Sequence, residues 1–162
     1  MSTTSQGIDA RAYLGNWANA LTGMLTADIK AIPDDKWTAT HGGCTRSAAD
    51  VTADALSLLV WTTEALRGHI GDNYDHSEGI KTACSTKEGA TEMLPSAVAA
   101  FSSALSGASD EALETVITPP WQMPAPLFMI AQIAVSHLWY HDGQLNYIQS
   151  LLGDDKIHWM GD

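Results

Sequence analysis

Basic residues are scarce in this chain of 162 residues, which has 8 Lys and Arg against 19 Asp and Glu and a formal net charge of -11. Proteins that bind nucleic acid neutralise its phosphates with clustered Lys and Arg side chains. The sequence contains no such cluster, so we expect no nucleic-acid partner. Anionic membrane surfaces also attract basic segments, and we therefore expect no membrane partner either.

Cysteines and long apolar runs are also rare. The only two cysteines, Cys44 and Cys84, lie far apart and without metal-type spacing, which argues against a disulfide framework. No apolar run reaches the roughly 18 residues of a transmembrane helix, and the N-terminus has no apolar signal core. We therefore expect a cytoplasmic protein.

The residues that are present favour a helical protein. Hydrophobic residues make up 45% and charged residues 17% of the chain, which predicts one domain over residues 1–162 with a core of its own. No segment alternates as a strand does between hairpin turns. Apolar residues recur at helical spacing over Asp9–Ala31, from Ser47 to Leu66, over Ala90–Leu105 and over Ala125–Leu152. This pattern predicts an all-α four-helix bundle, with a short helix at Asp110–Val116 and an irregular loop at His69–Gly89.

Two histidines of the last predicted helix carry the strongest functional signal. His137 and His141 are four residues apart, so a helix projects both rings from one face. They lie within the apolar stripe of that helix, and a buried polar group without a partner costs about 1–3 kcal/mol. The same spacing lets one helix offer two imidazole nitrogens to a single metal ion.

Asp54 is the candidate for a third ligand. It lies on the apolar stripe of the second predicted helix, where a lone carboxylate is costly unless it is paired or binds a cation. With His137 and His141 it would form a set of two histidines and one carboxylate that leaves coordination positions open. Two alternatives stay open at this point. The three residues could form a hydrogen-bonded cluster without metal, or Asp54 could face water.

The neighbours of these histidines are expected to play smaller parts. Gly143 inside a helix indicates close approach of a neighbouring helix. Gln144 is expected to make a structural contact, with a hydrogen bond near the site as the alternative. Asp142 and Asn146 are expected to face solvent, and His41 is expected to be a surface residue.

The chain resembles the DinB-like (DinB/YfiT) four-helix bundle superfamily, which is unrelated to the DNA polymerase of that name. The resemblance covers the helix layout of nearly the whole chain. Its specific part is the pattern of the last helix: His137, His141, Gly143, Gln144, Leu145 and Ile148. A weaker match runs from Trp37 to Leu59. The resemblance implies a divalent metal, zinc or nickel, held by a histidine triad.

One departure from the family pattern bears on this expectation. The histidine that many members carry on the second helix falls on Asp54, because this sequence has no histidine between His41 and His69. A carboxylate is a harder ligand than imidazole, so it shifts the preference towards manganese or iron. The site residues implied by the resemblance are therefore Asp54, His137 and His141, and no catalytic residue beyond them is assigned.

Three hypotheses about function follow. The first is a metal-dependent enzyme, such as a transferase that uses a low-molecular-weight thiol, because characterised relatives include such transferases and thiol-dependent isomerases. The second is a metal-binding or stress-response bundle protein without turnover. The third is a metal-free relative in which Asp54 pairs with the histidines. A homodimer is compatible with bundles of this type, although the sequence contains no heptad pattern of apolar residues that would predict one.

Overall fold

The computed structural model describes residues 8–71 and 77–160 of the chain. Within these residues the helices and strands are α1 (Ala10–Ala31), the 3-10 helix η1 (Asp34–Lys36), α2 (Ala48–Leu66), α3 (Ser77–Ala83), α4 (Lys87–Gly107), α5 (Asp110–Glu114), β1 (Val116–Ile117), β2 (Ala125–Pro126) and α6 (Leu127–Leu151). None of the described helices is long and apolar enough to cross a membrane.

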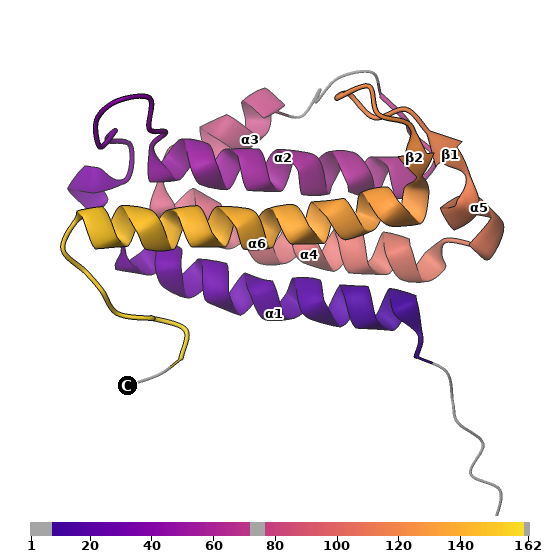
Figure 1. Cartoon of the computed structure of the whole chain (residues 1–162), viewed down its shortest axis with the longest axis horizontal. Coiled ribbons are helices and arrows are strands. Elements are labelled where there is room, and N and C mark those ends of the chain that lie inside the picture. The colour runs from indigo at the N-terminus through magenta and orange to yellow at the C-terminus, as the bar shows by residue number, and fades with distance from the viewer. Residues whose placement is uncertain (1–7, 72–76, 161–162) are drawn as a thin grey trace, which may run out of the picture.

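The four long helices form the predicted all-α bundle. α1 and α6 run side by side in the same direction, and α2 and α4 run the opposite way (Figure 1). α6 packs against both α1 and α2, and α4 packs against the same two helices. Because α6 has two neighbours, two of its faces are buried. One of these faces looks towards α2 and the other towards α1.

Side-chain caps fix where the first two long helices begin. The carboxylate of Asp9 accepts from the backbone N–H groups of Arg11 and Ala12. The hydroxyl of Ser47 accepts from the backbone N–H of Asp50. Such caps satisfy N–H groups that have no partner inside the helix. The predicted bounds of both helices are confirmed within a residue.

Other boundaries differ from the sequence prediction. The stretch predicted as an irregular loop contains α3, and its last residues already belong to α4. No strand was predicted, yet β1 and β2 pair antiparallel, with Ile117 opposite Ala125. Two residues per strand are too few to show alternation in a sequence. Because β2 takes up Ala125 and Pro126, the last helix begins at Leu127.

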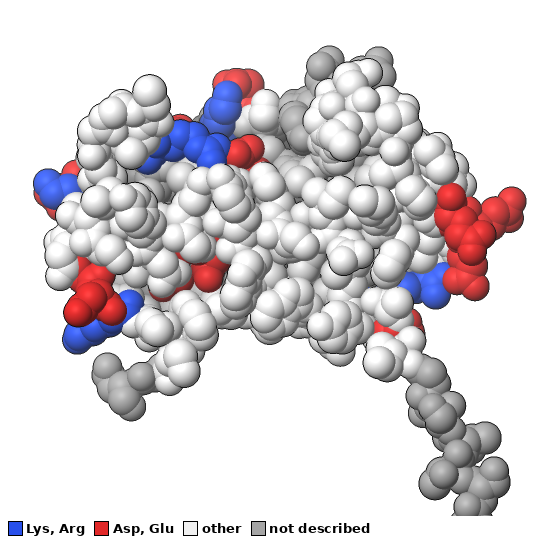
Figure 2. All heavy atoms as spheres, in the orientation of Figure 1, with Lys and Arg blue, Asp and Glu red and all other residues white. Residues whose placement is uncertain are grey.

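Charged side chains are distributed unevenly over the bundle. α6 contains one Asp, Glu, Lys or Arg, namely Asp142, and this residue is buried. In Figure 2, which looks onto α1 and α6, most of the face is white and charged residues lie mainly around its rim. The acidic residues that give the chain its net charge therefore lie largely away from this face.

Candidate metal centre

The structure brings Asp54, His137 and His141 together between α2 and α6. One ligand atom from each residue lies within 4.8 Å of the other two. Nε2 of His141 is 3.1 Å from Nε2 of His137 and 3.4 Å from Oδ2 of Asp54. The two imidazole rings meet edge to face, with centroids 4.2 Å apart. His141 is fully buried, His137 is half-buried, and the Asp54 side chain is 46% exposed. The cluster is thus open on the aspartate side.

Hydrogen bonds fix the tautomer of His141. A guanidinium only donates hydrogen bonds, so the atom of Gln144 that lies 3.1 Å from Nη2 of Arg46 is its carbonyl oxygen Oε1. The same oxygen is 2.8 Å from Nδ1 of His141, which therefore carries the proton. Nε2 of the neutral ring then presents a lone pair to Asp54 and His137. A hydrogen-bonded partner on the far nitrogen is typical of metal-ligating histidines.

Gln144 is held in this orientation from its other end as well. Its Nε2 donates to the hydroxyl of Tyr140 over 2.9 Å. The side chain of Gln144 thus joins Arg46, Tyr140 and His141 in one network. From the sequence, a structural contact was expected for Gln144, with a hydrogen bond near the site as the alternative. The structure shows the hydrogen bond.

His137 lacks the partner that His141 has. Its Nδ1 is buried and has no hydrogen-bond partner among the described residues. Nε2 of His137 can donate to Nε2 of His141, which leaves Nδ1 as a buried acceptor without a donor. A shared cation between the two Nε2 atoms would instead place the His137 proton on Nδ1.

Both rings are neutral at neutral pH. Burial, helped by the charge of His137, lowers the pKa of His141 to about 4, against the opposing effects of Gln144 and Asp54. Burial also lowers the pKa of His137, and the negative charge of Asp54 opposes this shift. Imidazole binds a metal only in its neutral form. The same desolvation that penalises the imidazolium therefore keeps both rings ready to act as ligands.

Arg46 is a site residue that the sequence did not predict. It immediately precedes the cap of α2, and its Nη1 lies 2.5 Å from Oδ2 of Asp54. This arginine therefore occupies the carboxylate oxygen that also faces His141. Arg46 precedes Asp54 by eight residues in the sequence, and this separation is the only signal that could have indicated the ion pair. Whether the two side chains meet depends on the course of the loop before α2. A sequence alone does not give that course.

Two cavities flank Arg46. One has a volume of about 330 Å³, and Asp54 forms part of its wall. The residues that line it are Arg46, Asp50, Ala53, Asp54, Ser57, Ser77 and Lys81. The other has a volume of about 180 Å³, and Gln144 is on its wall. The residues that line it are Cys44, Thr45, Arg46, Val51, Gln144, Tyr147, Ile148 and Leu151. α3 thus borders the open side of the cluster, within the stretch where an irregular loop was expected.

The donor set fits a divalent metal. Two imidazole nitrogens and one carboxylate oxygen are the ligands found in many mononuclear sites that keep open positions for water or substrate. The Nε2–Nε2 and Nε2–Oδ2 distances are close to the separation of two ligands on one tetrahedral ion, roughly 3.4 Å for metal–ligand bonds near 2.1 Å. The lone pair that Nε2 of His141 presents to the cluster agrees with this fit.

Three neighbours on α6 do not lie where the sequence placed them. Asp142 is buried rather than exposed, and it faces α1 instead of α2. Asn146 is half-buried and donates to Oδ2 of Asp28 over 2.7 Å. Gly143 is exposed, and a Cβ built on it would meet no atom within 4 Å. The expected close approach of a helix at Gly143 is therefore wrong.

One residue of the loop before α2, His41, is less exposed than the sequence predicted. His41 is half-buried rather than on the surface, and its Nε2 has no hydrogen-bond partner among residues 8–71 and 77–160. Gly42 and Gly43 follow with positive φ angles of 99° and 58°. Glycine adopts this backbone conformation without steric cost, which sets the turn that leads to Arg46.

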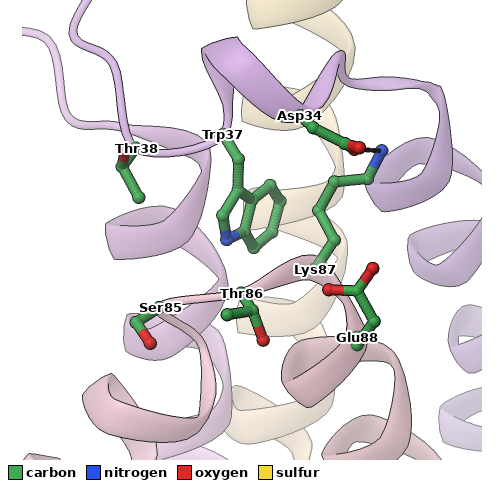
Figure 3. A pocket seen from close by; sticks show the side chains of 7 residues that line it. All are labelled: Asp34, Trp37, Thr38, Ser85, Thr86, Lys87 and Glu88. Atoms are coloured by element: carbon green, nitrogen blue, oxygen red, sulfur yellow. Dashed lines mark hydrogen bonds and ion pairs between the residues drawn. The ribbon is translucent and has the colours of Figure 1, made fainter.

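A third cavity, of about 270 Å³, lies where α1 ends and α4 begins (Figure 3). Nζ of Lys87 donates to the carbonyl oxygens of Lys30 and Ile32 and pairs with Asp34 at 2.8 Å. The indole N–H of Trp37 donates to the carbonyl of Cys84. These polar groups are all used within the chain, so we assign this cavity a structural role.

Fold and site together define a four-helix bundle with a His/His/Asp cluster between two of its helices. Two solved structures share the fold. One is the mycothiol-dependent maleylpyruvate isomerase, with 12% sequence identity, and the other is a histidine-to-alanine mutant of that enzyme, with 15% identity. Each aligns with a TM-score of 0.61 over 83% of this chain and 60% of the neighbour.

These comparisons bear on the fold alone. The chain spans only 60% of the length of each neighbour, and the identities are low. No family model matches the sequence, and no curated protein matches it. The likeness therefore confirms the predicted four-helix bundle.

Proposed function

We propose that the protein is a divalent-metal-dependent enzyme that acts on a small molecule with the help of a low-molecular-weight thiol. The observation that carries this proposal is the convergence of Asp54, His137 and His141 within 4.8 Å. The fold likeness to an isomerase that depends on mycothiol supports the thiol part of the proposal. A single domain over residues 1–162 is proposed with it.

A bound divalent metal would lower the pKa of a coordinated thiol and so supply a thiolate at neutral pH. The protein residues provide the conditions for this. Gln144 holds the His141 ring so that Nε2 faces the cluster, and burial of both rings favours their neutral form. The half-exposed Asp54 leaves one side of the cluster open to the cavity of about 330 Å³.

The substrate would lie in the cavity of about 330 Å³ beside Asp54. The hydroxyls of Ser57 and Ser77 and the ammonium of Lys81 border it, and they suit a polar small molecule. Arg46 separates this cavity from the one that Gln144 borders. Transfer of a group to or from the thiol is the reaction class proposed.

The metal is proposed from its ligands. Two imidazole nitrogens suit zinc or nickel, as the family resemblance implies, and the carboxylate of Asp54 favours manganese or iron more than a third histidine would. Metal content measured on protein expressed without a histidine tag separates these candidates.

A metal-free role is the second candidate, and Arg46 is the observation that favours it. The guanidinium already neutralises Asp54, and Nε2 of His137 can donate to Nε2 of His141 over 3.1 Å. In this alternative Asp54, His137 and His141 form a structural cluster without metal. It predicts that purified protein contains no stoichiometric metal and that added metal does not raise its melting temperature.

The test compares the wild type with Asp54→Ala and His137→Ala. Asp50→Ala is the matched control, because Asp50 is one helical turn from Asp54 and lines the same cavity but is outside the cluster. We expect one metal per chain in the wild type and the control, and none in the two cluster variants. A thiol-conjugation screen with loaded protein then tests turnover. Metal without turnover would favour a binding protein over an enzyme.

A further inference from the structure

A fourth cavity lies at the end of the bundle where α1 and α6 begin and α5 ends. Its volume is about 450 Å³, which is larger than that of the three cavities described above. Met129 forms part of its wall and precedes His137 by eight residues on α6, which corresponds to about 12 Å along the helix axis. The cavity is therefore separate from the candidate metal centre.

Most of the cavity wall is apolar, and its parts are joined to one another. The apolar lining residues are Ala10, Leu113, Pro126, Phe128 and Met129. The backbone N–H of Leu127 donates to the carbonyl of Thr115, and β1 pairs with β2, so the end of α5 and the start of α6 are held together. Arg11 of α1 forms an ion pair with Asp110 of α5. The cavity is thus already formed, and its volume lies in the range of roughly 300–1,000 Å³ that is typical of small-molecule sites.

One lining residue carries a charge that nothing in the described part of the chain neutralises. Arg11 and Glu114 are the two charged residues of the wall. Arg11 pairs with Asp110, whereas the Glu114 side chain has no hydrogen bond or ion pair with any residue of 8–71 or 77–160. Glu111 on the same short helix adds a second exposed carboxylate. Figure 2 shows the resulting red group at the end of the bundle where Figure 1 labels α5. The surroundings of the cavity are therefore negative.

The start of α6 opposes this negative charge only in part. The N-terminal end of a helix carries the equivalent of about half a positive charge, and the N–H of Leu127 is already used by Thr115. Glu111 and Glu114 each carry a full negative charge, and the whole chain has a net charge of -11. The electrostatic potential at the cavity therefore favours a cation over an anion.

We propose that this cavity binds a small amphipathic cation, an organic amine whose ammonium group lies beside Glu114 and whose apolar body packs against Leu113, Phe128 and Met129. Removal of the apolar body from water supplies affinity, and the unpaired carboxylate selects the charge. An aromatic ring on the same wall suits an ammonium group further, because its face attracts cations. This site goes beyond the proposed function, since none of its residues belongs to the metal centre.

Isothermal titration calorimetry with three related probes tests the charge of the ligand. 2-Phenylethylamine, 2-phenylethanol and phenylacetate carry the same benzyl group with a positive, a neutral and a negative end. We expect the amine to bind with a Kd of about 1 mM or below, which a ligand of this size can reach. The alcohol should bind about two- to fivefold more weakly, in the upper part of the range for part-exposed ion pairs, and phenylacetate more weakly still. EDTA in all samples excludes binding of the amine to a metal at the histidine cluster.

Two pairs of variants locate the binding. Glu114→Gln removes the carboxylate of the wall, and Glu92→Gln makes the same change on the exposed side of α4. Ala10→Trp fills the cavity from the first turn of α1, and Ala20→Trp places the same side chain on α1 outside the cavity. We expect Glu114→Gln to weaken binding of the amine about two- to fivefold without changing that of the alcohol. Ala10→Trp should weaken binding of both at least about tenfold, and the two control variants should bind as the wild type does.

Three results would overturn the proposal. The first is binding of the amine that either Glu114→Gln or Ala10→Trp leaves unchanged, because the amine would then bind elsewhere. The second is phenylacetate binding as tightly as the amine, and the third is no binding of the amine up to about 10 mM. Because every sample is free of metal, none of these results depends on the metal centre or on turnover.

Discussion

The guanidinium of Arg46 lies 2.5 Å from Oδ2 of Asp54, on the oxygen that also faces the buried ring of His141. Oδ2 of Asp54 thus pairs with the guanidinium of Arg46, and the same oxygen would be a ligand of a metal bound at the cluster. Two positive charges cannot share this oxygen without strong mutual repulsion. Arg46 and the metal must therefore compete, and the strength of that competition can be measured.

Replacing Arg46 with Met should raise the affinity for zinc. The ion pair is part-exposed, so its loss should favour the metal by roughly 0.2–1 kcal/mol, or about 1.4- to fivefold in Kd. Titration calorimetry with Zn²⁺ measures this change. Lys81→Met is the control, because Lys81 lines the same cavity but pairs with Glu78. An unchanged or weaker affinity in Arg46→Met would show that the arginine does not compete.

Replacing Gln144 with Leu should weaken metal binding. The variant removes the oxygen that accepts from Nδ1 of His141, so the ring is free to take the other tautomer and turn its N–H towards the cluster. Loss of such a partner typically costs 10- to 100-fold in metal affinity. Gln144→Glu keeps an acceptor at this position and should retain the affinity. If both variants bind metal as the wild type does, Gln144 has no such positioning role.

Asp142 should make stability fall as the pH rises. Burial, together with the charge and hydrogen bond of Asp28, raises the pKa of Asp142 to about 7 from its usual value of 3.8. Between these two values the folded state holds a proton that the unfolded chain has lost, so the contribution present at low pH is lost as the pH rises to about 7.

Asp142→Asn tests this effect because an amide imitates the protonated carboxyl. Relative to the wild type, the variant should gain about 1–3 kcal/mol in free energy of unfolding between pH 5 and pH 8. Urea unfolding at the two pH values measures the difference. The buried histidines act in the opposite direction in both proteins, so they cancel in this comparison. A difference that does not depend on pH would contradict the raised pKa.

Lys87 should be important for stability. Its ammonium donates to two carbonyl oxygens at the end of α1 and is only 16% exposed (Figure 3). Lys87→Met leaves these acceptors without their donor, which should cost about 1–3 kcal/mol. Lys81→Met, at an exposed ion pair, should change stability by no more than about 0.5 kcal/mol. Equal effects of the two substitutions in thermal unfolding would argue against the assigned structural role.

The sequence predicted those parts of the fold that depend on local patterns. Helical spacing located α1 and α2, and the same periodicity put His137 and His141 on one face. Asp54 was found because a carboxylate interrupts an apolar stripe. These signals lie within one helix each, so no knowledge of the tertiary structure was needed.

The parts that were missed depend on how the helices are placed. Asp142 was expected in solvent because it lies about 100° around the helix from His141, yet α6 buries one face against α2 and another against α1. Arg46 reaches Asp54 only because the turn at Gly42 and Gly43 directs the chain there. Neither the second packed face nor the course of that loop leaves a periodic signal in the sequence.

The most direct test of the proposed metal centre is an anomalous difference map from a crystal grown with one divalent metal and measured at its absorption edge. The account predicts one peak per chain, about 2.0–2.2 Å from Nε2 of His137 and Nε2 of His141 and from a carboxylate oxygen of Asp54, with Arg46 moved away from that carboxylate. A map without a peak between these residues, with Arg46 still paired to Asp54 in the presence of excess metal, would contradict it.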